Sequence, residues 1–253
     1  MSWAARRRFV ILLIVSAIIV AFLSTVLIAT LSKTPSCTDG VQNQDEAGTD
    51  CGGSCAYLCT ALEQPPTVLY TKALSYGGGR TDVIASIENK NANAAAKNVP
   101  YRITLFGAGQ ALIQEITGMI DLPPGTTVPV YVPQIVSDKQ EVIGAFLSVA
   151  AASPRWFSMA TNQRIVPLVE NTGQGGTADA PRIQATLVNP TVTSFSDVRT
   201  IIIVRNKSGD VIAASQTVVP LIPAQGQAVA TFTWNKAFPE TPAAIEVVPI
   251  IPL

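Results

Sequence analysis

The chain begins with a long apolar stretch, residues 9–31, that follows Arg6, Arg7 and Arg8 directly. At about 1.5 Å per residue this stretch would form a helix of roughly 35 Å, which exceeds the ~30 Å hydrocarbon core of a bilayer. A cleaved signal peptide is the alternative, but its apolar region usually covers about 7 to 15 residues. We therefore expect an uncleaved transmembrane helix over residues 9–31.

The basic residues before this helix predict its orientation. Arg6, Arg7 and Arg8 precede the apolar stretch, and only Lys33 follows it closely. Basic residues flanking a membrane span favour the cytoplasmic side. We expect residues 1–8 to be cytoplasmic and the rest of the chain, beyond residue 31, to be extracytoplasmic, so that the protein is a single-pass protein of the cell membrane.

From about residue 65 onward, apolar and polar residues alternate in short segments. Val99, Tyr101, Ile103 and Leu105 share one phase of this alternation. Proline and glycine turn signals interrupt the segments about every ten residues. This pattern is typical of half-buried strands in small antiparallel sandwiches.

The alternating region contains an apparent internal repeat of about a hundred residues. Both halves show, in the same order, an asparagine, an alternating strand, a glycine-containing turn, a proline turn and a final strand; Asn89 and Asn189 mark the two starts. We interpret the halves as two tandem immunoglobulin-like sandwiches, over residues 65–155 and 156–253. A single larger β domain is the alternative.

Composition removes several classes of function. The chain has 17 basic and 17 acidic residues and no histidine. A balanced charge does not provide the basic face that nucleic-acid binding requires. The absence of histidine removes the commonest general base and a common zinc ligand. We therefore expect neither a nucleic-acid partner nor an enzyme.

All four cysteines, Cys37, Cys51, Cys55 and Cys59, lie in residues 32–64, between the apolar stretch and the alternating region. In an exported segment too short for a core of its own, this number predicts two disulfides, with three pairings possible. A four-thiolate zinc site is the alternative. The spacing of the cysteines lacks the paired C-x2-C arrangement of common zinc modules.

The loop between the first two cysteines is rich in oxygen-bearing side chains, which are the ligands that calcium prefers. Candidate calcium ligands are Asp39, Asn43, Asp45, Glu46 and Asp50. The spacing is not that of an EF-hand, because Val41 and Gln44 occupy positions that need an oxygen ligand and a glycine. In the alternative interpretation, these side chains only stabilise turns by bonding to the backbone. Beyond calcium, we expect no cofactor.

Two resemblances to known families extend this interpretation. The pattern from Cys37 to Cys55, C-x-D-G-x-x-N-x-x-E-x-x-x-D-C-G-G-x-C, resembles an element of exported and membrane-anchored bacterial surface proteins of unknown role. That resemblance implies a surface location and disulfide bonding. The alternating region is similar to the FxLYD and late-embryogenesis-abundant families of small sandwiches, which implies an immunoglobulin-like fold.

Together these patterns predict a mainly β protein with one transmembrane helix, a short disulfide-rich stalk and two tandem sandwiches. We expect it to act as a non-catalytic binding or structural module, in adhesion or as a spacer. Its expected partners are the lipid bilayer and a protein or an envelope polymer. The alternative is an accessory subunit of a secretion, pilus or division complex of the cell envelope.

Overall fold

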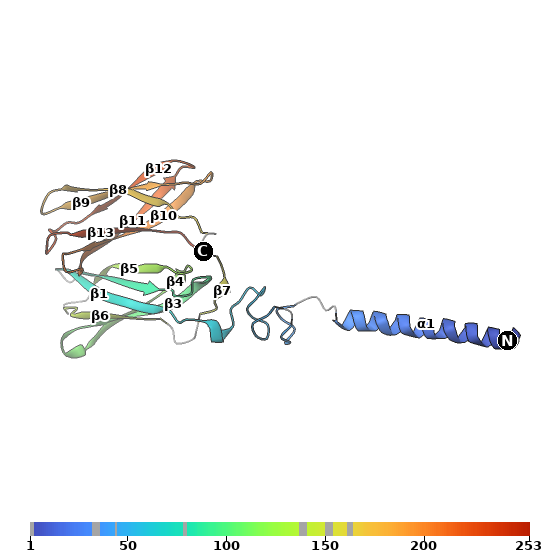
Figure 1. The fold of residues 1–253 in the computed structure, drawn as a ribbon. Helices are drawn as coiled ribbons and strands as arrows, with labels where there is room; N and C mark the ends of the chain where they lie inside the picture. Colours follow the sequence, from blue (N-terminus) through green and yellow to red (C-terminus); the bar gives the residue numbers. More distant parts are fainter. Residues whose placement is uncertain are drawn as a thin grey trace. The chain divides into compact units, whose positions relative to one another are not determined.

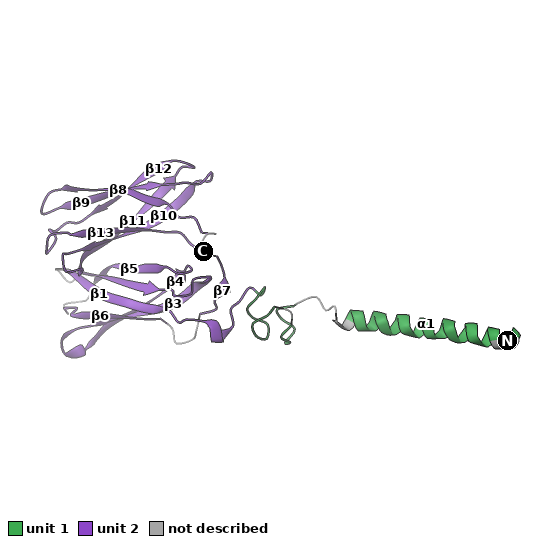
Figure 2. Cartoon of the chain, in the orientation of Figure 1, with its two compact units in different colours: residues 1–55 green, residues 56–253 purple. Residues whose placement is uncertain are grey.

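The fold is mainly β, with one N-terminal helix and several antiparallel sheets (Figure 1). The computed structural model describes residues 3–31, 36–43, 45–77, 80–136, 141–149, 154–160 and 164–253. Contacts divide the chain into two compact units, Met1–Cys55 and Ala56–Leu253 (Figure 2). The expected fold class is therefore present.

Helix α1 (Trp3–Leu31) contains the whole of the expected span. Its segment Arg6–Ala29 contains an 18-residue window with a mean hydropathy of 3.0 and is long enough to cross a membrane. Arg6, Arg7 and Arg8 are exposed near the start of the helix. Ser24 donates a hydrogen bond to the Val20 carbonyl at 2.7 Å. The Ser16 and Thr25 hydroxyls donate to the backbone carbonyls three residues before them. These hydroxyls therefore have hydrogen-bond partners within the helix and need no water.

The first sandwich has six main strands in two sheets, ordered β1-β2-β5 and β4-β3-β6, and a short strand β7 beside β3. Their bounds are β1 (Thr67–Gly77), β2 (Arg80–Glu88), β3 (Ala94–Phe106), β4 (Leu112–Leu122), β5 (Thr127–Val136), β6 (Gly144–Val149) and β7 (Phe157–Ser158). Short 3-10 turns are η1 (Thr60–Leu62) and η2 (Ala108–Gln110). The alternating positions Val99, Ile103 and Leu105 fill the core between these sheets, as the sequence predicts.

The second sandwich repeats this strand order, with sheets β12-β9-β8 and β11-β10-β13. Its strands are β8 (Leu168–Gly176), β9 (Pro181–Val188), β10 (Phe195–Arg205), β11 (Val211–Ile222), β12 (Gln227–Thr233) and β13 (Ala244–Ile250). In both sandwiches the first, second and fifth main strands form one sheet, and the fourth, third and sixth form the other. Phe232 and Ile202 are among the fully buried residues of its core.

A buried asparagine closes each sandwich in the same way. Asn89 donates through its side-chain amide to the carbonyls of Ala94 and Pro123, at 2.8 and 2.7 Å. Asn189 donates to the carbonyls of Thr193 and Pro223, at 2.7 and 2.9 Å. Both side chains are about 1% exposed, so the amide is the donor that satisfies carbonyls that water cannot reach.

The two sandwiches are stacked on each other, because sheet β1-β2-β5 of the first packs on sheet β11-β10-β13 of the second. Leu74 and Ile84 form one apolar cluster with Ile201, Ile203 and further residues of the second sandwich. The central strands β2 and β10 are therefore buried on both faces, and their burial is nearly continuous where the sequence predicted alternation.

A polar contact accompanies this apolar interface. Arg205 of β10 donates to the Tyr70 hydroxyl of β1 at 3.1 Å, and its guanidinium lies 5.1 Å from the centre of the Tyr70 ring. Burial raises the pKa of Tyr70 above its ordinary value, while Arg205 acts in the opposite direction. Arg205 also lies 3.7 Å from the Glu246 carboxylate.

The opposite, outward faces of the stack carry polar residues at the matching positions. Aligning Asn189 with Asn89 places Gln184 where β2 has Ile84. Aligning Ile103 with Ile202 likewise places Arg102 and Thr104 where β10 has Ile201 and Ile203. Gln184 and Arg102 are exposed. At these positions the outward faces are therefore more polar than the two sheet faces that meet.

The boundaries between segments differ from those expected. Residues 56–64, assigned to the stalk, belong to the β unit by their contacts. Trp156 is fully buried in the first core, and β7 pairs with β3, so the first sandwich extends beyond residue 155. The neighbouring residues 150–153 and 161–163 lie outside the described part of the chain.

Ile203→Ala tests whether the sandwiches fold as one stacked unit. Ile203 is 1% exposed in the cluster between the sheets, so the truncation should lower the free energy of unfolding by about 2 to 4 kcal/mol. The control is Val229→Ala on β12, whose side chain is 55% exposed. Urea unfolding of the full chain in micelles, followed by tryptophan fluorescence, measures both. Equal, small effects would contradict the stacking.

Asn89→Asp and Asn189→Asp test the buried asparagines. Each change keeps the shape but replaces amide donors with an oxygen that faces carbonyl acceptors, so each should lower the free energy of unfolding by at least about 3 kcal/mol. The same substitution at the exposed Asn171 is the control and should be nearly neutral. Similar stability for all three variants would show that these hydrogen bonds do not hold the turns.

Candidate functional site

The cysteine segment is fully oxidised. Cys37 and Cys55 form a disulfide with a Cα–Cα distance of 5.6 Å across 18 residues of sequence. Cys51 and Cys59 are disulfide-bonded as well, and no cysteine is free. Four cysteines then leave one connectivity, first to third and second to fourth. The two disulfides predicted from the sequence are present, and no thiolate remains for the alternative zinc site.

The carboxylates of the oxygen-rich loop bind the loop's own N–H groups. The Asp50 carboxylate accepts from the backbone N–H groups of Asp39 and Gly40, at 2.9 and 3.0 Å. Asp39 accepts from the Val41 backbone at 3.0 Å and from the Asn43 side chain at 3.0 Å. These are bonds of the turn-stabilising kind, the alternative to calcium ligation.

The two remaining carboxylates, Asp45 and Glu46, also have partners within the segment. Asp45 accepts from the Ser54 hydroxyl at 2.9 Å. Glu46 is only 6% exposed; one of its oxygens accepts from the Asn43 backbone, and the other lies 3.2 Å from the Cys55 sulfur.

Glu46, Cys37 and Cys55 bring three candidate ligand atoms within 4.8 Å of one another. Both sulfurs belong to a disulfide, however, and a disulfide sulfur is not the thiolate that metals bind. Calcium binding by Asp39, Asn43, Asp45, Glu46 and Asp50 stays a prediction.

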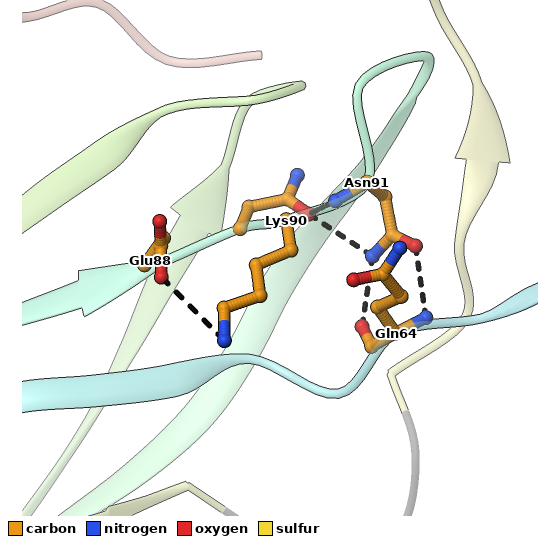
Figure 3. Close-up of polar contacts among 5 residues, drawn as sticks. Gln64, Glu88, Lys90 and Asn91 are labelled. Atoms are coloured by element: carbon orange, nitrogen blue, oxygen red, sulfur yellow. Dashed lines mark hydrogen bonds and ion pairs between the residues drawn. The ribbon is translucent and has the colours of Figure 1, made fainter.

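Residues 56–64 are fastened to the first sandwich by hydrogen bonds. The Asn91 side chain donates to the Gln64 carbonyl at 2.8 Å and accepts from the Gln64 N–H at 2.9 Å, as Figure 3 shows. Asn91 is itself positioned by Asn89, and Lys90 between them lies 3.9 Å from the Glu88 carboxylate. Leu58 donates to the Trp156 carbonyl at 3.0 Å. The start of the β unit is therefore anchored at two places.

A cleft of about 430 Å³ opens between the sandwiches, where edge strands β5 and β13 border the stacked sheets. Its apolar walls include Val128 and Val130 of β5, Ile201 of β10 and Val247 of β13. This volume lies in the range of small-molecule sites, about 300 to 1,000 Å³. Sequence reasoning missed the cleft, because its walls come from strands more than a hundred residues apart.

Three charged side chains line this cleft: Asp121, Arg164 and Arg199. The Asp121 carboxylate accepts from the backbone N–H groups of Asn98 and Leu253, at 2.9 and 3.0 Å. Arg164 donates to the Ile251 carbonyl, while its buried Nε has no hydrogen-bond partner among the described residues. Burial lowers the pKa of Arg164 from its ordinary value, although the Asp121 charge opposes this shift.

Tyr101 contributes a hydroxyl to the same cleft, and its position is fixed by a glycine. Tyr101 pairs with Gly118 across β3 and β4, and a Cβ on Gly118 would lie 2.3 Å from the Tyr101 hydroxyl oxygen. The tyrosine therefore covers the glycine, which must lack a side chain. Burial raises the pKa of Tyr101, and the nearby charge of Arg199 counteracts this effect.

Comparisons with known proteins identify no family. No protein-family model matches the sequence, and no curated protein is significantly similar to it. Among solved structures, the chain is similar to red sea bream transglutaminase at 11% identity and a TM-score of 0.24, over 74% of this chain and 29% of that one. A likeness at that TM-score carries no argument about function.

Paired cysteine substitutions test the connectivity. The double substitution of Cys37→Ser and Cys55→Ser removes one whole bridge and leaves the other intact. This variant has no free thiol, so an alkylating reagent should not modify it until it is reduced. Cys37→Ser with Cys51→Ser instead removes half of each bridge and should expose two reactive thiols. Intact mass spectrometry after alkylation counts the thiols. Two reactive thiols in the first variant would contradict this connectivity.

Proposed function

We propose that this protein is a single-pass, membrane-anchored module whose β unit lies outside the cytoplasm and serves a binding or structural role. The observation that carries the proposal is the pairing of one exposed apolar helix, Arg6–Ala29, with a separate, well-packed β unit, Ala56–Leu253. A helix with such an apolar surface needs a lipid environment, whereas the β unit has cores of its own.

Two further observations support the proposed orientation. The arginines at positions 6–8 are on the N-terminal side of the apolar helix, which favours a cytoplasmic N-terminus. The cysteines on its other side are all oxidised, which suits an extracytoplasmic compartment.

A role in binding or spacing, without catalysis, accords with the available side chains. The chain has no histidine, and its four thiols are consumed by disulfides. These are two of the side-chain types most often used as general base and nucleophile. The cleft between the sandwiches is the place where a small ligand would fit.

Protease accessibility in intact cells tests the anchoring and the orientation. The chain carries a tag at its C-terminus. Before digestion the protein should have its full-length mass, because the helix is not cleaved off. External protease should then remove the tag. The protein should also resist extraction from membranes by alkaline carbonate. Replacing Arg6, Arg7 and Arg8 with alanine should leave a fraction of the chains inverted and protected.

Loss of residues before about position 32 from the mature protein would contradict the anchor and establish a signal peptide. Protection of the tag in the unmodified chain would contradict the orientation. Exchanging the helix for an unrelated apolar helix separates the proposed module, which should keep its role, from the accessory subunit of an envelope complex, which should lose it.

A further inference from the structure

The cleft between the sandwiches combines apolar walls with an unbalanced positive charge. Among the residues that line it, Arg164 and Arg199 are cationic and only Asp121 is anionic. Asp121 lies near Arg164 and offsets its charge, as the opposing shift on the Arg164 pKa indicates. Arg199 has no carboxylate within ion-pair distance among the described residues. The side chains that line the cleft therefore include one more cation than anion.

Arg199 is directed to the cleft by the register of β10. It is two residues before Ile201, whose side chain packs toward the first sandwich, and alternate residues of a strand share one face. Tyr101 of β3 also lines the cleft, and the Arg199 charge acts to lower the pKa of its hydroxyl. A donor hydroxyl and a guanidinium thus face the same space from the two sandwiches.

Other polar groups of the lining can add to anion binding. The buried Nε of Arg164 is an N–H donor without a hydrogen-bond partner in the described part of the chain. Gln216 of β11 pairs with Ile201 and brings a neutral amide to the lining beside Arg199. Guanidinium groups bind carboxylates through charge-assisted, often bidentate hydrogen bonds.

The walls favour a compact apolar body over an extended peptide. Ile120, Val128, Val130 and Val247 provide an apolar lining for a cavity of about 430 Å³. A peptide would be expected to add as a strand to β5 or β13, the edge strands at the cleft. Pro129, Pro133 and Pro249 lie on these strands and lack the N–H groups that a new strand would need.

We infer that this cleft binds a small organic carboxylate with an apolar body, whose carboxylate pairs with Arg199 and whose body lies against the β5 and β13 walls. This inference gives the binding role proposed above a ligand class. It does not depend on the orientation in the membrane, because the cleft lies entirely within the β unit.

Fluorine NMR on the full chain in lipid nanodiscs tests the inference. The probe is 4-(4-fluorophenyl)butyrate, and the matched controls are the amine and the alcohol with the same apolar body. Transverse relaxation of the fluorine should increase with added protein for the carboxylate, and the carboxylate should bind at least about tenfold more tightly than the amine. Empty nanodiscs correct for partition into lipid.

Substitutions at Arg199 and Gln216 locate the site. Arg199→Gln should weaken carboxylate binding roughly 10- to 100-fold, whereas Arg199→Lys should retain part of the affinity because it keeps the charge. Gln216→Glu is nearly isosteric and should abolish binding by placing an anion beside Arg199. The control, Arg182→Gln, removes an exposed arginine from β9, outside the cleft, and should have no effect.

Several results would overturn the inference: no carboxylate binding up to millimolar concentration, equal binding of the amine, or an unchanged affinity in both Arg199→Gln and Gln216→Glu. Tryptophan fluorescence of each variant establishes that it is folded. A protein that binds the carboxylate in nanodiscs but is inverted in cells would retain the ligand site and lose only the proposed orientation.

Discussion

The packing of one sandwich on the other is the interaction on which the rest of the β unit depends. Ile84 of β2 and Ile201 and Ile203 of β10 lie on sheet faces that would be exposed to water in a single sandwich. Burying such side chains stabilises a protein by roughly 1.5 to 3 kcal/mol each. The interface therefore joins the two cores into one unit, and edge strands β5 and β13 beside it line the cleft.

The stacking is asymmetric, because it joins non-equivalent sheets. The sheet formed by the first, second and fifth strands in one sandwich meets the sheet formed by the fourth, third and sixth strands in the other. Such a head-to-tail contact could in principle continue indefinitely. The outer faces stop it, since Gln184 and Arg102 occupy the positions that are isoleucine at the interface. Polar end faces of this kind terminate stacked proteins and keep them soluble.

Much of the fold could be predicted from the sequence, because apolar periodicity reports which faces are buried. Val99, Ile103 and Leu105 lie in the core as their alternation predicts, and the apolar helix follows from length and composition. The run from Ile201 to Val204 departs from alternation, and two-sided burial is its cause. Which sheets would meet was not predictable, because the contact depends on partners far apart in sequence. The cleft followed neither from a motif nor from spacing, since its lining comes from strands of both sandwiches that are far apart in sequence.

Hydrogen exchange resolved along the chain tests the stacking most directly. We expect the central strands β2 and β10 to be the most protected parts of the β unit. Their slowest amides should exchange through one opening reaction with the same free energy, because neither sandwich keeps its inner sheet covered without the other. Exchange of β10 through its own opening reaction while β2 stays protected, or the reverse, would show that the sandwiches open independently and would contradict the stacking.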